Sequence, residues 1–137
     1  MKEVLRQMLR IYKPVSQMDW LNYKLKKDDI TYHHIKKRED GGKKDISNGA
    51  ILMPNSHSYL HLIECLDIDT YILLNEIFKE VNGQMYEPTI EQRQIIDKIL
   101  EEFEDNHRWD KGNKGKLLVK KKYLDRCRFW QNIYIVL

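Results

Sequence analysis

The sequence has little of what stabilises small secreted proteins or inserts into membranes. Its 137 residues include two cysteines, three prolines and six glycines, and no stretch approaches the roughly eighteen apolar residues of a membrane span. Two cysteines cannot build a disulfide framework, and without a CxxC pair a four-cysteine zinc knuckle is excluded. The charged first ten residues contain no apolar segment of a secretory leader. We therefore expect reduced thiols, a cytoplasmic location and no membrane insertion.

Positive charge is scarce between Glu64 and Asp105, where twelve acids accompany three bases, and a polyanion would not dock on that surface. Basic residues gather instead in a run from Lys111 to Arg128 and beside a histidine-rich stretch. The second group consists of Lys36, Lys37, Arg38, Lys43 and Lys44. Clustered Lys and Arg side chains favour contacts with nucleic-acid phosphates. The alternative, an ordinary solvated face, has equal weight for the C-terminal run and less for the other.

The length fits a single domain, and the apolar spacing predicts a mostly helical α+β fold. Helices are predicted over 3–12, over 20–25 after an N-cap at Asp19, over 69–81 with Gly83 closing the helix, and from a capping box at Thr89 and Gln92 through 103. The apolar stripes of the last two helices are predicted to be core. The segment 109–116 is predicted to be flexible, and 117–137 to be helix or strand.

A compact unit of two strands and a helix is predicted near the middle of the chain. Residues 30–35 and 50–53 are short, rich in β-branched and apolar residues, and typical of strands. The polar segment 36–48 between them is predicted to be a loop. A helix is predicted to follow the second strand, from a cap at Asn55 or Ser56 towards Leu66.

Four of the five histidines lie between positions 31 and 62. His57 and His61 are four residues apart, so on a helix their Cβ atoms lie roughly 6 Å apart and the rings can hold one divalent ion. A strand packed against that helix can supply His33 as the third ligand. Three protein ligands leave open positions for water and a phosphate oxygen, which is typical of a catalytic site. Cys65 lies too far along the helix for the same ion and is expected in the core.

His34 and Asn48 are candidates for a second task. Successive strand residues point to opposite faces, so His33 and His34 cannot both bind the same ion. His34 is then available as a general base, because an imidazole can take a proton from water close to neutral pH. The amide of Asn48 both donates and accepts, and can hold the loop or the backbone of the base in place. Gly41 and Gly42 permit a tight reversal and the close approach of a duplex.

The order His-His, Gly-Gly, Asn and His-x-x-x-His resembles the motif of the HNH, or His-Me finger, endonucleases, and within them the colicin-type DNases. The resemblance covers about 31 of the 137 residues. It implies a central ββα-metal unit over about 30–66, braced by a helical scaffold over 1–29 and 67–137. It also implies hydrolysis of DNA, double-stranded in the first instance, with one divalent metal ion. A phage or mobile element is the typical setting of such enzymes.

The resemblance carries over to individual positions. It places His33, His57 and His61 as metal ligands, His34 as general base, and Asn48 as the residue that braces the base loop. Arg38 is the nearest match to the arginine that often assists at the phosphate. Imidazole ligands suit Zn²⁺, Ni²⁺ or Co²⁺ by affinity, while availability and an open site keep Mg²⁺ and Mn²⁺ as candidates.

Two other interpretations stay open on the sequence alone. A catalytically silent module could keep the same fold and bind nucleic acid without cutting it. A structural metal-binding domain could instead use the acidic helices as a surface for another protein. All five active positions carry chemically competent residues, which argues against a decayed enzyme.

Overall fold

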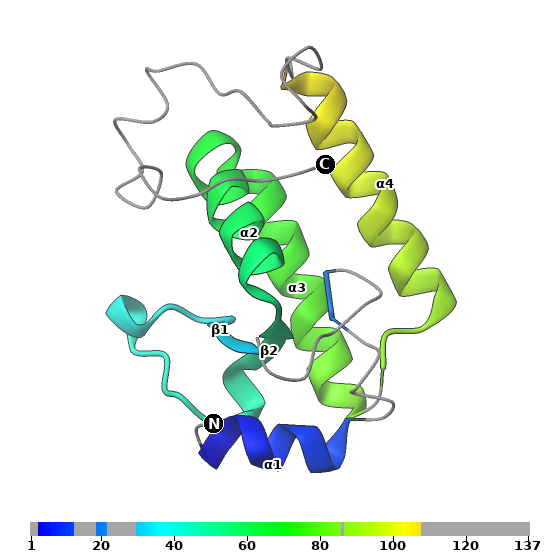
Figure 1. The fold of residues 1–137 in the computed structure, drawn as a ribbon. Helices are drawn as coiled ribbons and strands as arrows, with labels where there is room; N and C mark the ends of the chain where they lie inside the picture. The colour runs from blue at the N-terminus through cyan, green and yellow to red at the C-terminus, as the bar shows by residue number, and fades with distance from the viewer. Residues whose placement is uncertain (1–2, 13–18, 22–29, 86, 108–137) are drawn as a thin grey trace.

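The fold is α+β and mostly helical, as predicted (Figure 1). A computed structural model describes residues 3–12, 19–21, 30–85 and 87–107. The elements in chain order are α1 (Glu3–Ile11), β1 (Thr31–His34), the 3₁₀ turns η2 (Arg38–Asp40) and η3 (Ile46–Asn48), β2 (Gly49–Leu52), α2 (Pro54–Leu66), α3 (Ile68–Gln84) and α4 (Ile90–Asn106). The predicted segments 109–116 and 117–137 lie outside the described residues.

The two strands form a small antiparallel sheet. His33 pairs with Ala50 and His34 pairs with Gly49, so the strands predicted over 30–35 and 50–53 are present with slightly different bounds. α2 follows β2 directly, contacts both strands and packs against α3, which in turn contacts α4 (Figure 1). The histidine-bearing strand and the histidine-bearing helix are therefore neighbours in space.

The loop between the strands depends on both of its adjacent glycines. Gly41 has a φ of +88°, in the left-handed region that residues with a Cβ adopt only at a cost. Gly42 is required for a different reason, because a Cβ at this position would collide with the backbone carbonyl of Lys36. Its N–H donates to the carbonyl of Lys37 at 2.9 Å. The predicted tight reversal is confirmed.

The start of α2 differs from the prediction. The N-cap is Met53 and the first helical residue is Pro54, so the expected cap at Asn55 or Ser56 is wrong. Proline suits the first helical position because its φ is already helical and its missing N–H would have had no partner there. The helix thus begins directly after β2, and His57 lies in its first turn.

The ends of α3 and α4 show where local signals succeed and fail. α3 continues past Gly83 to Gln84, and its C-cap is Met85, which has a φ of +54°. The predicted termination at the glycine is therefore wrong. The capping box at Thr89 and Gln92 is confirmed, with both reciprocal hydrogen bonds formed at the start of α4.

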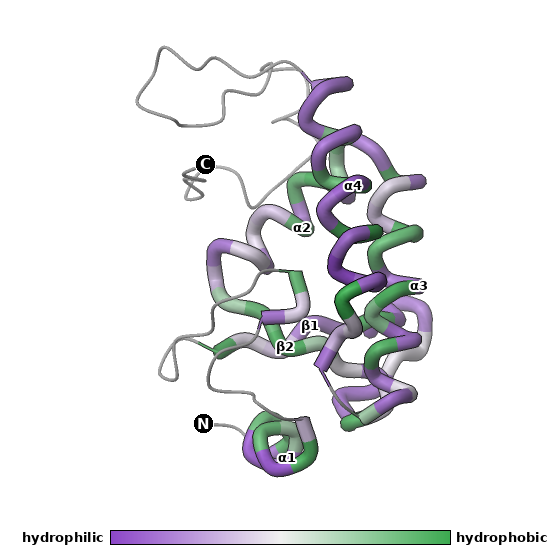
Figure 2. The backbone as a smooth tube through the Cα atoms, turned by 90° about the vertical axis from the view of Figure 1, so that its right-hand side faces the viewer, coloured by the Kyte–Doolittle hydropathy of each residue, from purple (hydrophilic) through white to green (hydrophobic). Residues whose placement is uncertain are grey.

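The core lies where α2 and α3 meet the sheet and α1. Its largest fully buried side chains are Tyr12, Trp20, Ile51, Leu60, Leu74 and Phe78, together with Ile96 and Phe103 from α4. Three residues predicted to be core are exposed: Ile72 and Leu73 are each 48% exposed and Ile95 is 51% exposed. The buried stripe is therefore narrower than the apolar pattern. Hydrophobic and hydrophilic residues alternate along both α3 and α4 (Figure 2).

Buried polar side chains hold the sheet to its surroundings. Asn82 of α3 donates to the carbonyls of Ile46, at 2.7 Å, and Gly49, at 2.8 Å, and accepts a hydrogen bond from the hydroxyl of Tyr12 at the end of α1. Asn82 is 5% exposed, so these bonds satisfy an amide that would otherwise be costly to bury. The loop that precedes β2 is thereby fixed to α3.

Residues 19–21 do not form the predicted helix, and the rest of that prediction lies outside the described residues. The fully buried carboxylate of Asp19 accepts hydrogen bonds from the backbone N–H of Leu21, at 2.9 Å, and of Met53, at 3.1 Å. The N–H of Trp20 donates to the carbonyl of Ile51 at 3.1 Å. Asp19 therefore also stabilises the junction of β2 and α2.

No helix in the described part of the chain combines the length and the apolar character needed to cross a membrane. Cys65 is half-buried and disulfide-bonded in the structure, so the expectation of a reduced core thiol is wrong at this position. Cys127 lies outside the described residues.

Candidate metal centre

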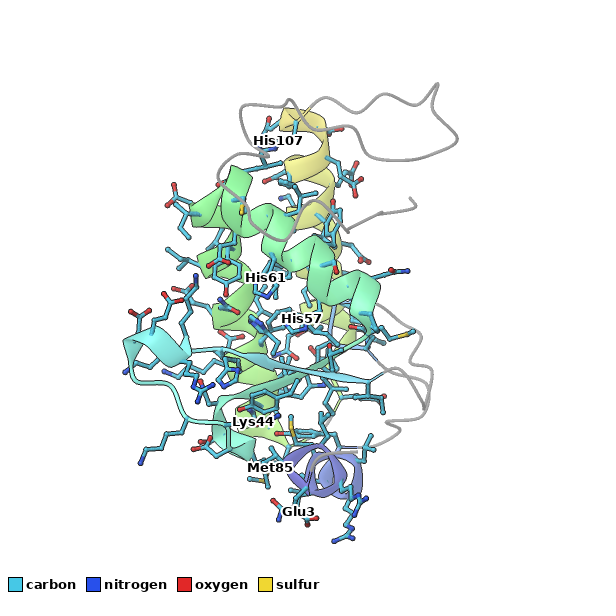
Figure 3. The ribbon with its side chains drawn as sticks, turned by 60° about the vertical axis from the view of Figure 1, so that its left-hand side comes forward. Glu3, Lys44, His57, His61, Met85 and His107 are labelled. Atoms are coloured by element: carbon cyan, nitrogen blue, oxygen red, sulfur yellow. The ribbon has the colours of Figure 1, made fainter. Side chains whose placement is uncertain are left out.

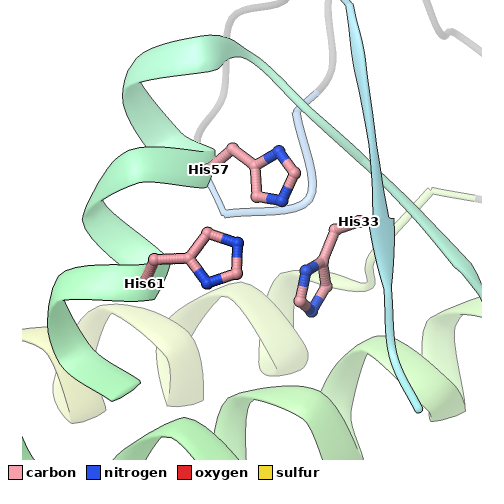
Figure 4. A group of neighbouring side chains, drawn as sticks. All are labelled: His33, His57 and His61. Atoms are coloured by element: carbon pink, nitrogen blue, oxygen red, sulfur yellow. The ribbon is translucent and has the colours of Figure 1, made fainter. Parts of the chain in front are cut away.

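Three histidines from two elements converge on one point. His33 comes from β1, and His57 and His61 come from adjacent turns of α2 (Figures 3 and 4). One nitrogen of each ring lies within 4.8 Å of the corresponding nitrogens of the other two. The ring centroids are 5.4 Å apart for His33 and His57, 6.0 Å for His33 and His61, and 4.8 Å for His57 and His61. This spacing allows all three rings to bind one ion.

The tautomer of His57 is fixed by Thr31. The hydroxyl of Thr31 donates its proton to the carbonyl of Leu52 at 2.6 Å. Its oxygen lies 3.0 Å from Nδ1 of His57 and is left to accept. Nδ1 of His57 therefore carries the proton, and Nε2 keeps a free lone pair.

His33 is held in the opposite sense. Its Nε2 lies 2.8 Å from the amide oxygen of Asn75 on α3, and an amide oxygen can only accept. Nε2 of His33 therefore carries the proton and Nδ1 has the lone pair. Figure 4 shows the labelled rings each turning one nitrogen towards the space between them.

His61 completes the set. Its Nδ1 lies 3.1 Å from Oε1 of Glu64, one turn further along α2. A carboxylate only accepts, so Nε2 of His61 has the lone pair. The three polar partners leave Nδ1 of His33, Nε2 of His57 and Nε2 of His61 unprotonated, as ligation requires. Three imidazoles with fixed orientation fit a divalent transition-metal ion such as Zn²⁺.

Burial keeps two of these rings neutral. Desolvation lowers the pKa of His33 to about 3, although the hydrogen bond to Asn75 acts in the other direction. Desolvation also lowers the pKa of His57 to about 4, with a further contribution from the charge of His61. Both rings are therefore neutral over the physiological pH range and need lose no proton to bind an ion.

His34 lies on the other face of β1, as strand geometry predicts. Its ring packs edge-on against Tyr32, with centroids 4.8 Å apart, and it is not part of the three-histidine group. It nevertheless lines the same pocket of about 290 Å³ as His33, His57 and His61. Burial, followed by the charges of Lys44 and Arg38, lowers the pKa of His34, so the ring can accept a proton near neutral pH.

Asn48 binds the backbone that follows His34. Its Oδ1 accepts from the N–H of Lys36 at 2.7 Å, and its Nδ2 donates to the carbonyls of Lys36, at 2.9 Å, and Lys43, at 3.0 Å. Its own carbonyl accepts from the N–H of Ile35 at 2.9 Å. Asn48 thus ties both ends of the loop together beside the histidine pocket.

The basic residues near the site divide into three groups. Lys37 and Arg38 line the histidine pocket. Lys44 lies over the ring of Tyr32, 5.3 Å from its centroid, and is half-buried. Lys36 and Lys43 are exposed on the loop. The basic run from 111 to 128 lies outside the described residues, so the structure positions only the first basic cluster.

Sequence reasoning missed the residues that orient the ligands. The role of Glu64 could have been predicted, because it follows His61 by three residues and helical geometry puts the two side chains next to each other. The role of Thr31 could also have been predicted, since residue 31 and His33 share a strand face that packs on α2. No sequence pattern points to Asn75, because it lies 42 residues from His33 and only the packing of α3 brings the two together.

Comparisons with family models, curated proteins and solved structures found no match for this chain.

Proposed function

We propose that this protein is a metal-dependent endonuclease of the HNH, or His-Me finger, type that hydrolyses phosphodiester bonds in DNA. The observation that carries the proposal is the convergence of three unprotonated ring nitrogens, on His33, His57 and His61, in a pocket that a fourth imidazole also lines. The order of strand, glycine loop, strand and helix supports the same assignment.

His33, His57 and His61 would hold the divalent cation, and their imidazole nitrogens suit Zn²⁺, Ni²⁺ or Co²⁺, with Mg²⁺ and Mn²⁺ as further candidates. When bound, the ion supplies positive charge that stabilises the phosphorane and the leaving 3′-oxygen. The hydrogen bonds that His57 donates to Thr31 and His33 donates to Asn75 keep the rings in the ligating tautomer. The rings are thereby oriented for ligation before substrate binds.

His34 acts as the general base and accepts a proton from the attacking water. Its lowered pKa keeps it neutral and able to do so at pH 7. Asn48 restrains the backbone of Lys36, two residues after His34, and so keeps the base in a fixed position relative to the histidine pocket. Attack of water on phosphorus breaks the bond to the 3′-oxygen and leaves a 5′-phosphate on one fragment. The departing 3′-oxygen takes a proton from solvent water to become the 3′-hydroxyl of the other fragment, and His34 returns its proton to solvent.

The loop supplies the surface for the DNA backbone. Lys37 and Arg38 line the pocket and contact the reacting phosphate, while Lys36 and Lys43 are exposed and contact neighbouring phosphates. Gly41 has no side chain and open space around it, so a duplex can approach the loop closely.

Cleavage of supercoiled plasmid tests the proposal. The purified protein is incubated with plasmid and, in separate reactions, Mg²⁺, Mn²⁺, Zn²⁺, Ni²⁺, Co²⁺ or a chelator. We expect conversion to nicked or linear DNA with at least one ion and none with the chelator. Retarded but intact plasmid would identify the silent binding module instead, and neither binding nor cleavage would leave the structural metal-binding domain.

A further inference from the structure

Glu64 occupies a position that neither the ligand set nor the general base explains. It lies on α2 one turn beyond His61, its side chain is 15% exposed, and it lines the pocket of the three histidines. Its two carboxylate oxygens have different partners: Oε1 lies 3.1 Å from Nδ1 of His61, and Oε2 forms an ion pair with the ammonium of Lys37. Glu64 thus joins a candidate ligand to the basic loop.

The hydrogen bond to His61 has a chemical consequence. Oε2 of the same carboxylate is paired with the ammonium of Lys37, so Glu64 faces His61 as a charged acceptor. An ionised carboxylate can only accept, so it fixes the proton of His61 on Nδ1 and turns Nε2 towards His33 and His57 (Figure 4). Such carboxylate–histidine pairs raise the basicity of a metal-ligating ring.

The ion pair to Lys37 has a second consequence. Lys37 is on the loop after β1, and its ammonium also lies 5.9 Å from the centre of the Tyr71 ring. The pairing with Glu64 holds this long side chain at the pocket, although it stays 41% exposed. The hydrogen bond to Glu64 also raises the pKa of Lys37, so the ammonium stays charged. An ammonium has three donors, and Glu64 uses only part of this capacity.

We propose that Glu64 is a positioning residue that fixes the Nδ1–H tautomer of His61 and holds the ammonium of Lys37 at the pocket, where it contacts the phosphate. The proposal rests on the proposed function for the phosphate contact. The tautomer and the metal affinity follow from the geometry of Glu64 and His61 and can be measured without any DNA.

Glu64→Gln tests the first half, with Glu104→Gln as the matched control. Glu104 on α4 accepts a hydrogen bond from the hydroxyl of Tyr59 on α2 at 2.9 Å, away from the histidines. Titration with Co²⁺, followed by its visible spectrum, should show affinity reduced about 10- to 100-fold in Glu64→Gln and unchanged in Glu104→Gln. Nitrogen NMR of the metal-free protein should find His61 protonated on Nδ1 in the unmodified chain and mixed in Glu64→Gln.

Lys37→Met tests the second half. We expect a raised KM for DNA and a lower kcat, because Lys37 contacts the reacting phosphate, together with unchanged Co²⁺ affinity. Equal Co²⁺ affinity in the unmodified chain and Glu64→Gln, or a proton on Nε2 of His61 in the unmodified chain, would overturn the role of Glu64 while the nuclease assignment stands. Failure of the unmodified chain to bind Co²⁺ at the histidines would instead overturn the proposed function.

Discussion

The side chain of Asn48 binds both the N–H and the carbonyl of Lys36, two residues after the proposed base, His34. One amide therefore fixes the backbone on which that base depends, although it does not itself line the histidine pocket. This arrangement separates residues that would react from residues that would hold others in place, and the two kinds should respond differently to substitution.

Asn48→Ala should slow DNA cleavage without abolishing it. The change removes three side-chain hydrogen bonds to the loop backbone, so His34 samples unproductive positions while remaining chemically intact. We expect kcat to fall by about 10- to 100-fold, as for other residues that orient a reacting group. Single-turnover cleavage of a short duplex measures this, and an unchanged rate would contradict the bracing role.

His34→Ala and His57→Ala should fail in different ways. His34 is outside the ligand set, so its loss should abolish cleavage and leave Co²⁺ affinity nearly intact. His57→Ala removes one of three ligands and should weaken Co²⁺ binding directly. Isothermal titration calorimetry with both variants distinguishes the two roles. Equal loss of metal binding in both variants would refute the assignment of His34 as a base.

The metal-free protein should lose stability as the pH falls below about 6.5. The folded-state pKa is about 3 for His33 and about 4 for His57, against 6.5 when unfolded. The unfolded chain therefore binds more protons in this window, and the free energy of unfolding should fall by up to about 1.4 kcal/mol per pH unit for each ring. Urea denaturation in chelator measures it at pH 7.5, 6 and 5.

The matched variants for that experiment are His57→Gln and His107→Gln. His57→Gln removes one buried titrating ring, so its stability should depend less steeply on pH than that of the unmodified chain. His107 lies at the end of α4, away from the pocket, and His107→Gln is the control that loses an imidazole elsewhere in the chain. Parallel curves for all three proteins would show that the buried histidine contributes nothing to the pH dependence.

Replacing Lys36, Arg38 and Lys43 together with glutamine should weaken DNA binding and make it less sensitive to salt. All three side chains are exposed on the loop beside the pocket. Each lost phosphate contact reduces the slope of log K against log salt by about 0.9 on a B-form duplex. Fluorescence anisotropy between 50 and 200 mM salt provides the slope. Lys98→Gln, on the acid-rich α4, is the control and should leave it unchanged.

The three glycines at 41, 42 and 83 should tolerate alanine very differently. Gly42→Ala places a methyl group against the backbone carbonyl of Lys36, so both stability and cleavage should drop sharply. Gly41→Ala forces a left-handed alanine and should cost about 1 kcal/mol. Gly83 lies within α3 with open space around it, so Gly83→Ala should stabilise the protein by about 0.5 to 1 kcal/mol. Thermal denaturation ranks them, and equal effects would contradict the loop geometry.

Much of the fold is encoded in local patterns. The capping box at Thr89 and the turn glycines at 41 and 42 identify their elements because each satisfies a backbone requirement within a few residues. Local patterns fail where the environment decides. Ile72 has helical spacing like its buried neighbours, yet it is 48% exposed because none of the described elements covers that side of α3. Asp19 is a residue type typical of helix N-caps, but its carboxylate accepts a hydrogen bond from the backbone N–H of Met53, 34 residues away.

The candidate site divides in the same way. Pairing at i and i+4 places His57 and His61 on one face of a helix, and the strand alternation separates His33 from His34. The depth of His33 and its bond to Asn75 depend on how α3 packs against the sheet, which no short pattern encodes. Sequence therefore predicts which imidazoles meet, while the tertiary structure determines which nitrogen each one offers.

Cleavage measured against the amount of bound ion tests the central claim most directly. Metal-free protein is mixed with a labelled duplex and titrated with Co²⁺ while product and visible spectrum are recorded together. We predict that the cleavage rate rises with the spectrum and reaches its plateau at one ion per chain, and that His34→Ala gives the same spectrum with no product. A fully loaded protein that leaves the duplex intact would contradict the account.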